Sequence, residues 1–202
     1  SDVLQGRMIT RRRYKNTAQT LPLLGFGCMR LPQLSPDRPE IDYGTVKQMI
    51  DRAMKAGCNY FDTAYMYHDG RSERCLGDLL KAYPRDSYYL TDKMPVWFAR
   101  DAAGIERIFR EQLERCRTDY FDFYMLHSLD SANWELAQKY KACEFLERMK
   151  KEGKIRRLGF SFHDSPEVLR KIVDAREWDF AQIQLNYLDW ELYRSREQYE
   201  IL

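Results

Sequence analysis

Short apolar runs alternate along the chain with longer segments whose apolar residues recur at helical spacing. The apolar runs have the length and composition of β-strands and cover residues 23–27, 59–62, 87–93, 120–126, 155–160 and 180–185. Helical patterns follow them at residues 43–56, 71–82 and 133–151, after Asp101, and in stretches that begin at 165 and 195. Strands that alternate with helices of this length pair in parallel through right-handed crossovers. The pattern therefore predicts about six strand–helix units of an α/β fold.

Residues with a known preference for helix ends flank two of these segments. Asp42 precedes the helical pattern at 43–56 and is expected to be its N-cap, while Gly57 is expected to end it in a left-handed conformation. Ser165 and Pro166 open a later helix, with the proline at its first position. These signals fix the ends of two helices more closely than the periodicity alone.

Two arrangements are consistent with such alternation: an open doubly wound sheet and a closed barrel. A dinucleotide-binding open sheet carries G-x-G-x-x-G after its first strand, but residues 25–30 read Gly-Phe-Gly-Cys-Met-Arg and lack the third glycine. Polar residues stand instead at the ends of several strands, namely Asp62, Lys93, His127, Ser161 and Gln184. In a barrel those strand ends meet on one face, where active sites are built. The sequence therefore favours a (β/α)₈ barrel, and we expect residues 1–202 to form a single domain.

The amino-acid composition limits the kinds of partner that the protein is expected to bind. The 202 residues are 44% hydrophobic and 32% charged with a net charge of +2, which is typical of a soluble globular protein and gives no electrostatic reason to expect nucleic acid. The basic run at residues 11–13 is predicted to be a solvated turn or hairpin. No segment has the length of a membrane span or the features of a leader peptide, so we expect no membrane association. The five cysteines are dispersed and lack a C-x-x-C pair, which predicts a reducing, cytoplasmic location without disulfides or zinc.

The candidate chemistry lies at three neighbouring strand ends. Asp62, Lys93 and His127 follow successive predicted strands, and Tyr67 lies five residues after Asp62. An acid, an amine, an imidazole and a phenol in one place suit proton transfer to a carbonyl oxygen. From these residues alone, a structural Asp–Lys pair is an equally acceptable interpretation, and Tyr65 is a second phenol in the same loop.

Several ordered motifs resemble the aldo-keto reductase family. They are Gly-Cys-Asn-Tyr-Phe-Asp-Thr-Ala at 57–64, then Glu73, Leu76 and Gly77, Lys93, Leu126-His127, Gly159-Phe160-Ser161 and Gln182-Ile183-Gln184. The resemblance extends over about residues 20 to 200. It implies a (β/α)₈ barrel that reduces aldehydes or ketones with NADPH or NADH, NADPH being favoured. It also matches Asp62, Tyr67, Lys93 and His127 to the family's catalytic tetrad.

The resemblance gives each member of the tetrad a chemical role. A tyrosine has an ordinary pKa of about 10, and a nearby ammonium lowers that pKa by favouring the phenolate. Lys93 would supply the ammonium, Asp62 would hold Lys93 charged, and His127 would orient the substrate oxygen. Tyr67 would then be the general acid in reduction and the general base in oxidation of the corresponding alcohol.

Four further residues are candidates for the cofactor site that the resemblance implies. Ser161 and Gln184 match residues that hold the nicotinamide carboxamide, a group to which a hydroxyl and an amide can both donate and accept. Met29 lies in the loop after the first strand, and either contacts the cofactor or packs in the loop. The family often has Ser-Asn where this chain has Ser161-Phe162, so that His163 either replaces the asparagine or faces solvent.

The same motif resembles a branch of the family that carries a C-terminal ferredoxin-like segment with a 4Fe-4S cluster. The cysteines of such a cluster would lie beyond Leu202. A complete barrel has eight strands in about 250 residues, so six units indicate a barrel truncated on its C-terminal side, and we expect little activity from residues 1–202 alone.

Two other functions remain open on sequence grounds. One is a barrel that binds the cofactor without turnover and acts as a regulatory or binding subunit. The other is a metal-dependent hydrolase, which the absence of H-x-H and H-E-x-x-H spacings disfavours. The oligomeric state and the identity of the substrate have no signal in the sequence.

Overall fold

A computed structural model describes residues 8–192 and 194–202 of the chain. It divides into two compact units. The first contains the residues up to Asp92 together with Glu114–Thr118, and the second contains Lys93–Leu113 together with Asp119–Leu202. The strand and the helix at these boundaries, β7 (Tyr89–Met94) and α4 (Ala102–Arg115), therefore contribute residues to both units.

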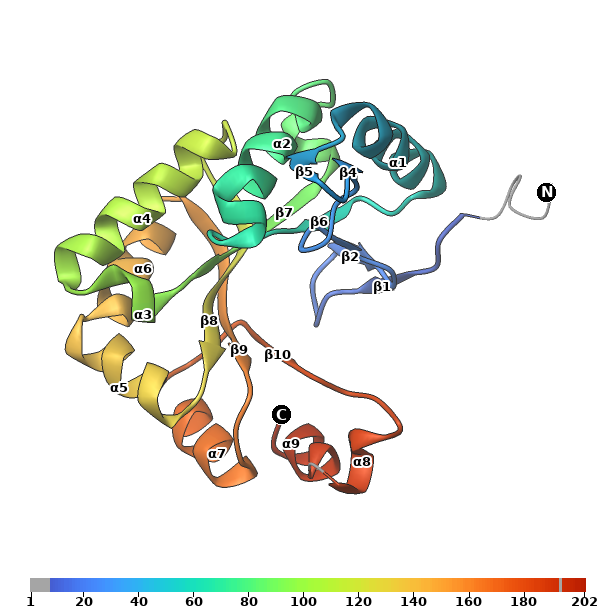
Figure 1. The fold of residues 1–202 in the computed structure, drawn as a ribbon. Coiled ribbons are helices and arrows are strands. Elements are labelled where there is room, and N and C mark those ends of the chain that lie inside the picture. Colours follow the sequence, from blue (N-terminus) through green and yellow to red (C-terminus); the bar gives the residue numbers. More distant parts are fainter. Residues whose placement is uncertain (1–7, 193) are drawn as a thin grey trace. The chain divides into compact units, whose positions relative to one another are not determined.

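The first unit consists of short strands, two helices and two 3₁₀ turns (Figure 1). Besides part of β7, its elements are β1 (Arg11–Arg13), β2 (Thr20–Pro22), β3 (Phe26–Gly27), β4 (Gln33–Ser35), β5 (Arg38–Ile41), α1 (Tyr43–Ala56), β6 (Tyr60–Asp62), η1 (Tyr67–Gly70), α2 (Arg71–Leu80) and η2 (Arg85–Ser87). Strand β6 pairs in parallel with β3 on one side and with β7 on the other. The β3–β6–β7 order brings the loops after β3 and β6 to the same end of the sheet.

Helix α1 has the bounds that its sequence predicts. The side chain of Asp42 accepts a hydrogen bond from the backbone N–H of Thr45, at 3.0 Å, and so caps the helix. Gly57 ends it with φ +86°, a left-handed conformation that a side chain disfavours. Local signals were sufficient here because both caps lie within one turn of the helix they end.

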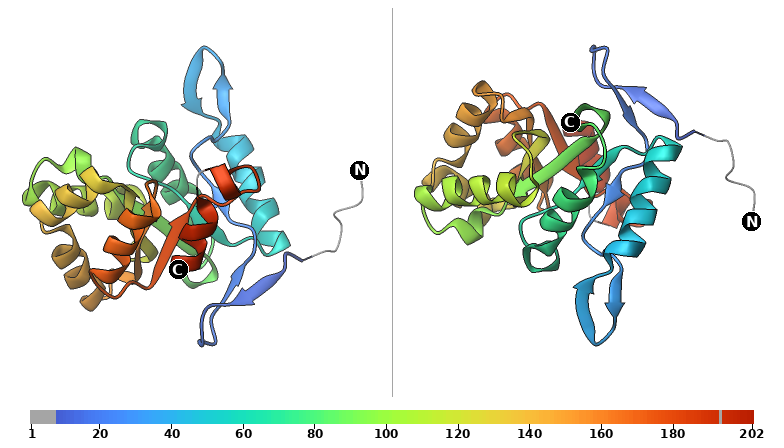
Figure 2. Two further views of the ribbon diagram at one scale, coloured as in Figure 1. Left: turned by 90° about the horizontal axis from the view of Figure 1, so that it is seen from below. Right: turned by 90° about the horizontal axis from the view of Figure 1, so that it is seen from above.

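Two antiparallel hairpins project from the first unit at its opposite ends (Figure 2). The hairpin of β1 and β2 contains the basic run at residues 11–13, and this confirms the predicted hairpin. The hairpin of β4 and β5 lies in a segment that contains Pro36 and Pro39. Pro39 lies in its short second strand, where a proline at an exposed edge removes no buried hydrogen bond.

The second unit contains the longer strands and most of the helices. Besides parts of β7 and α4, its elements are α3 (Val96–Ala99), β8 (Phe121–Leu129), α5 (Ser131–Lys139), α6 (Ala142–Lys151), β9 (Ile155–Phe162), α7 (Pro166–Asp174), β10 (Phe180–Ile183), α8 (Asp189–Leu192) and α9 (Ser195–Ile201). Strand β9 pairs in parallel with β8 and with β10. Helices α5, α6 and α7 lie along one side of β8 and β9 (Figure 1).

Among the described residues, the parallel strands follow the order β10-β9-β8-β7-β6-β3, which confirms the six strands expected from the apolar runs. Each is followed by a helical segment, as strand–helix units with crossover connections require. Gly159, in β9, is required by close packing, because an added Cβ would lie 2.3 Å from the carbonyl oxygen of Phe180 in the neighbouring strand.

Aromatic side chains form the centre of the second unit's core. The ring of Phe109 contacts Phe121, Tyr124 and Phe145 edge-to-face, with centroid separations of 5.9, 5.1 and 5.7 Å. Such pairs stabilise by about 0.5–1.5 kcal/mol each beyond the area they bury. The single side chain of Phe109 thereby packs helix α4 against both β8 and α6.

Several predicted elements differ from the structure by a few residues at their ends, and two of the differences change the interpretation. The single helix expected over 133–151 is two helices, α5 and α6, because Lys141 between them adopts a left-handed conformation with φ +53°. The strand expected over 120–126 continues to Leu129, so that His127 lies inside β8 and not after it. Both predictions were wrong. The apolar periodicity continues across the break at Lys141, and the apolar run ends before the strand does.

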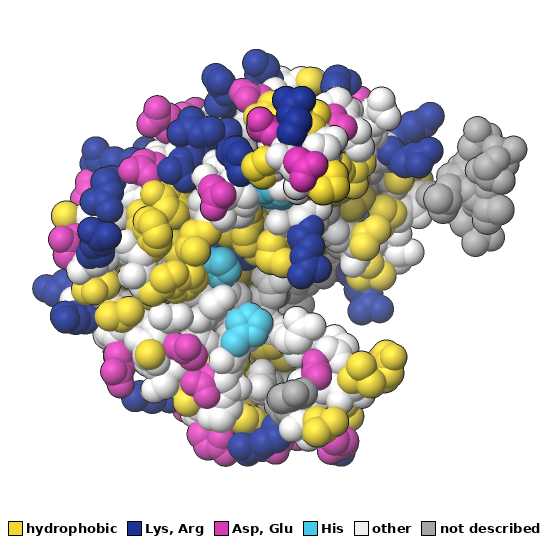
Figure 3. All heavy atoms as spheres, in the orientation of Figure 1, with side chains coloured by type: hydrophobic (Ala, Val, Ile, Leu, Met, Phe, Trp, Pro, Cys, Tyr) yellow, Lys and Arg dark blue, Asp and Glu magenta, His cyan; other side chains and the backbone are white. Residues whose placement is uncertain are grey.

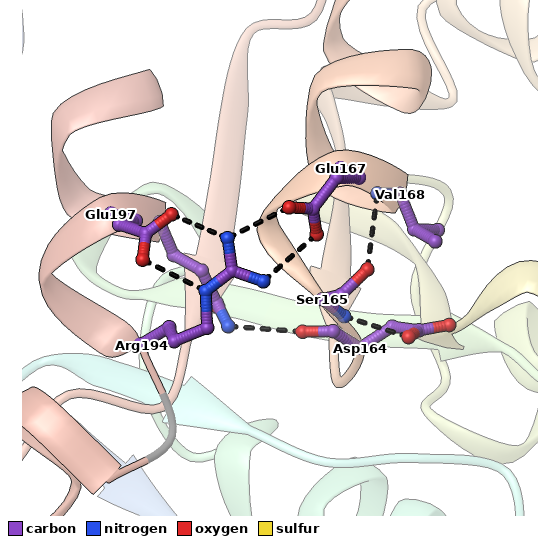
Figure 4. Close-up of polar contacts among 7 residues, drawn as sticks. Asp164, Ser165, Glu167, Val168, Arg194 and Glu197 are labelled. Atoms are coloured by element: carbon purple, nitrogen blue, oxygen red, sulfur yellow. Dashed lines mark hydrogen bonds and ion pairs between the residues drawn. The ribbon is translucent and has the colours of Figure 1, made fainter.

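Helix α9 is joined to α7 through one arginine (Figure 4). The guanidinium of Arg194 lies between the carboxylates of Glu167 and Glu197, with N–O distances of 2.7 and 2.6 Å. Gln198 donates a hydrogen bond to the carbonyl oxygen of Asp164 at 3.0 Å. The guanidinium lowers the pKa of Glu167 to about 2, so both carboxylates remain charged at neutral pH.

Positive and negative side chains are interspersed over α4 and its neighbouring helices (Figure 3). In the part of the chain that the structure describes, no helix combines the length and the apolar character that a membrane crossing requires. All five cysteines are free thiols.

Candidate functional site

The residues that the sequence proposed for catalysis and cofactor binding fall into two sets. Asp62, Tyr67 and Met29 belong to the first unit, and Lys93 and His127 belong to the second. Ser161, His163 and Gln184 also belong to the second unit. The geometry within each unit shows what holds each set in place.

In the first unit, a network of backbone and hydroxyl groups fixes the strand end at Asp62. The carbonyl oxygen of Asp62 accepts a hydrogen bond from the N–H of Cys28, at 2.8 Å. Next to it, the hydroxyl of Thr63 is 2.9 Å from that of Ser72, which donates to the carbonyl oxygen of Cys28. Thr63 and Ser72 are fully buried, so these hydrogen bonds are shielded from water. Met29, which follows Cys28, is half exposed.

Tyr67 opens a turn with an unusual backbone. Its N–H donates to the carbonyl oxygen of Ala64 at 3.1 Å, and the next three residues have positive φ: His68 at +52°, Asp69 at +54° and Gly70 at +82°. A left-handed conformation costs a residue with a side chain about 1–2 kcal/mol. Successive left-handed residues persist only where surrounding contacts determine them, and they are frequent at functional sites.

The side chain of Arg115, at the end of α4, lies close to the residues on both sides of this turn. Its guanidinium pairs with the fully buried carboxylate of Glu73 at 3.4 Å and lies over the ring of Tyr65, 4.4 Å from the centroid. It also donates to the carbonyl oxygen of Tyr65 at 3.5 Å. A Cβ on Gly70 would come within 3.0 Å of the same guanidinium. The ring of Tyr65 is thus part of a packed ion-pair cluster.

In the second unit, a relay of buried polar groups fixes the backbone at Lys93. The side-chain amide of Gln112 donates to the carbonyl oxygen of Lys93 at 2.8 Å, and its own oxygen accepts a hydrogen bond from the hydroxyl of Tyr124. Gln112 and Tyr124 are fully buried and Lys93 is 3% exposed. The sequence reasoning missed this relay. Its signal was a glutamine on the apolar face of α4, in register with Ile105 and Phe109.

The electrostatic state of His127 is set by its surroundings in the second unit. Burial lowers the pKa of His127 to about 3, and the charges of Lys93 and His163 act in the same direction. The imidazole is therefore neutral at physiological pH and has one N–H donor. The indole of Trp97, in α3, packs against it with a centroid separation of 5.3 Å.

Ser161 is engaged in a bulge of β8. Its hydroxyl oxygen accepts a hydrogen bond from the N–H of Ser128 at 2.7 Å, and the side chain of Asn133 donates to the carbonyl oxygen of Ser128 at 2.9 Å. Ser128 has φ +50°, and the β8–β9 register shifts between Leu126 and Leu129. Bulges redirect side chains near active sites. Because Ser161 accepts through its oxygen here, its hydroxyl proton is directed elsewhere.

The remaining predicted positions are more exposed. His163 follows β9 with an exposed side chain, and its backbone N–H donates to the carbonyl oxygen of Leu129 at 2.9 Å. Gln184 directly follows β10 and is also exposed. Both side chains are exposed and therefore accessible to a ligand. Among the described residues, no group of three or more His, Cys, Asp or Glu side chains is arranged to hold a metal ion.

Comparison with known proteins identifies the family to which the chain belongs. Residues 23–202 match the model of the Aldo/keto reductase family. The uncharacterized oxidoreductase YqkF of Bacillus subtilis is 30% identical in an alignment of length 181 that covers 82% of this chain and 53% of YqkF. The methylglyoxal reductase YeaE of Escherichia coli is 30% identical over 142 residues, which are 70% of this chain and 46% of YeaE. The chain thus spans about half the length of these curated relatives.

Solved structures show the same fold. A putative aldo-keto reductase of Pseudomonas aeruginosa, PA4992, superimposes with a TM-score of 0.78 at 22% identity, covering 100% of this chain and 76% of that protein. An aldo-keto reductase of Klebsiella pneumoniae in complex with NADPH superimposes with a TM-score of 0.68 at 26% identity, covering 89% of this chain and 61% of that protein. The fold is a (β/α)₈ barrel, of which this chain contains six strand–helix units.

Proposed function

Because the chain belongs to the aldo/keto reductase family, we propose that it is the catalytic part of an NAD(P)H-dependent carbonyl reductase with Tyr67 as its general acid. The observation that carries the proposal is the environment of His127 in the second unit. A lysine that is 3% exposed acts electrostatically on a neutral histidine, against which an indole packs. A histidine whose pKa is strongly lowered by burial, beside a buried lysine, is typical of a catalytic site.

Each residue of the proposed tetrad has a distinct task. The ammonium of Lys93 stabilises the phenolate of Tyr67, which makes the phenol acidic enough to protonate a forming alkoxide. The carboxylate of Asp62 keeps Lys93 protonated and in place. The neutral imidazole of His127 donates its N–H to the carbonyl oxygen and orients it, without competing with Tyr67 as an acid.

The side chains of the second unit suit a nicotinamide. Ser161 has its oxygen engaged by the N–H of Ser128 and retains a proton to donate, while Gln184 is exposed and can both donate and accept. This donor set fits a carboxamide, and we assign its binding to these two residues, with Met29 and His163 as further contacts. A reduced nicotinamide, when bound, supplies the hydride. We favour NADPH over NADH, in line with the NADPH complex of the Klebsiella protein.

The proposed substrate is a small aldehyde or ketone, or the corresponding alcohol in the reverse direction. Methylglyoxal and glyoxal reductases are among the relatives, and compact dicarbonyls are therefore the first compounds to assay. We further propose that residues 1–202 belong to one barrel domain in a cytoplasmic protein. Six strand–helix units alone are expected to have little turnover, since the loops of a complete barrel build its active site.

The test is a pair of phenol-to-phenyl substitutions in the full-length protein. We expect Tyr67→Phe to lower kcat for methylglyoxal by about 100-fold or more, the usual effect of removing a general acid, with little change in NADPH affinity. Tyr65→Phe is the matched control, because it removes a hydroxyl from the same loop and keeps the ring on which Arg115 lies. NADPH oxidation measures turnover, and quenching of nicotinamide fluorescence measures binding.

Two outcomes would contradict the proposal. If wild-type protein binds NADPH and turns over no carbonyl, the chain is a non-catalytic cofactor-binding barrel. If Tyr65→Phe and not Tyr67→Phe abolishes turnover, the assignment of the acid is wrong although the activity is right.

A further inference from the structure

The imidazole of His68 connects two loops of the first unit. Its Nε2 accepts a hydrogen bond from the backbone N–H of Leu31, at 2.8 Å. Leu31 is 4% exposed and lies two residues after Met29 in the loop that follows β3. His68 directly follows Tyr67 in the turn after β6. This hydrogen bond therefore joins the Met29 loop to the Tyr67 turn over 37 residues of sequence.

The turn has a strained backbone, so such a connection has structural consequences. His68 and Asp69 are left-handed without being glycines. Arg71 donates from Nε to the carbonyl oxygen of His68 at 2.9 Å, which holds the backbone on the side of α2. On the other side of the turn, the His68 imidazole is hydrogen-bonded to the backbone of the loop that contains Leu31. If the acceptor is lost, a buried N–H at Leu31 loses its partner and the turn loses one of its restraints.

We propose that His68 is a positioning residue that ties the Met29 loop to the turn carrying Tyr67, and that the tie exists only while the imidazole is neutral. A protonated imidazole carries hydrogen on both ring nitrogens and cannot accept from Leu31. Acidification therefore releases both loops together. The consequence for turnover rests on the proposed function, in which Tyr67 is the acid and Met29 contacts the cofactor.

The electrostatic surroundings keep the tie intact at neutral pH. Burial lowers the pKa of His68 from its ordinary 6.5, and the charge of Arg71 acts in the same direction. The carboxylate of Asp69, which is largely exposed, opposes them by raising the pKa. The loop on the other side contributes Leu31 and the exposed Arg30. Release is thus expected only below pH 6.5, and removal of the Asp69 charge would move it to still lower pH.

Three substitutions in the full-length protein test the tie. His68→Gln keeps an acceptor close to the position of Nε2 but does not titrate. His68→Leu removes the acceptor. Asp69→Asn keeps a residue that tolerates the left-handed conformation and removes only the charge. The measurements are the amide resonance and hydrogen exchange of Leu31 between pH 5 and 8, and kcat/KM for methylglyoxal over the same range.

We expect the Leu31 amide of the wild type to titrate together with the His68 ring, and at lower pH in Asp69→Asn. In His68→Gln this titration and the matching acid decline of kcat/KM should disappear. In His68→Leu, exchange at Leu31 should be faster by roughly 2- to 10-fold at every pH, as loss of one hydrogen bond predicts. The proposal is overturned if the Leu31 amide does not follow the His68 titration, or if His68→Leu leaves its exchange unchanged. Because both readings are independent of turnover, they separate failure of the tie from failure of the proposed function.

Discussion

The guanidinium of Arg115 lies over the ring of Tyr65, 4.4 Å from its centroid, while the same guanidinium neutralises Glu73. The ion pair joins the end of α4 to α2 and to the start of the Tyr67 turn, all within the first unit. The guanidinium therefore interacts with two groups. It packs on the aromatic face of Tyr65, and it neutralises the charge of the buried Glu73 carboxylate.

We expect Arg115→Met to destabilise the protein by about 3–5 kcal/mol, because it leaves the buried Glu73 carboxylate without its cation. Urea unfolding at pH 7 measures the change. The double substitution Arg115→Met with Glu73→Gln should recover part of the loss, since it removes the buried charge as well. A destabilisation below about 1 kcal/mol for Arg115→Met would show that Glu73 does not depend on Arg115.

Features encoded within one turn of chain were predictable from the sequence. The N-cap at Asp42, the left-handed Gly57 and the helix opening at Ser165 depend on neighbours a few residues away, and all were confirmed. The six strands were also predictable from their apolar runs, most clearly β8, because a strand buried on both faces is a continuous apolar run.

Features that depend on distant residues were not predictable. The left-handed Ser128 and the bulge that extends β8 beyond His127 depend on Ser161, 33 residues later, which accepts the Ser128 N–H. The buried Gln112 is explained by its hydrogen bonds to the backbone of Lys93 and the hydroxyl of Tyr124, which lie on two other elements. The roles of Asp62, Tyr67, Lys93 and His127 came from the family resemblance, and they stay predictions until the substitutions are measured.

The lowered pKa of His127 predicts a pH dependence of stability. The folded protein keeps this histidine neutral down to about pH 3, whereas the unfolded chain protonates it near 6.5. The unfolded state therefore binds more protons between those values, and the free energy of unfolding falls as pH falls from 6.5 to 3. The full effect of one such group is about 5 kcal/mol.

His127→Gln should remove most of this slope, because glutamine does not titrate. Urea unfolding of both proteins at several pH values between 4 and 7 provides the measurement. Equal slopes for the wild type and the variant would mean that His127 titrates in the folded protein as it does in the unfolded chain, and would remove the basis for its role as a donor held neutral by burial.

Substitution of Ser161 tests the bulge. We expect Ser161→Ala to cost about 1–3 kcal/mol of stability, because the Ser128 N–H loses its acceptor in a partly buried position. The matched control is Ser128→Gly, which keeps the N–H and relieves the left-handed strain, and should be neutral or stabilising by up to about 1 kcal/mol. If Ser161→Ala is as stable as the wild type, the bulge is held by Asn133 alone.

Gly104 determines how closely α4 approaches α3, the helix that carries Trp97. A Cβ at Gly104 would lie 1.7 Å from the carbonyl oxygen of Ala99, which no rotamer change can relieve because that oxygen belongs to the backbone. Gly104→Ala should therefore destabilise by at least about 2 kcal/mol, although alanine is the better helix former.

Gly44 is the matched control for this substitution, because it lies in the first turn of α1 and an added Cβ there would meet only the Asp42 carboxylate, at 3.4 Å. Gly44→Ala should be stabilising by about 0.5–1 kcal/mol. Displacement of α3 in Gly104→Ala would also move the indole away from His127, which the fluorescence of Trp97 can report. If both glycine variants are equally stable, α3 can move away from α4 at little cost, and its contact with His127 is not rigidly determined by the fold.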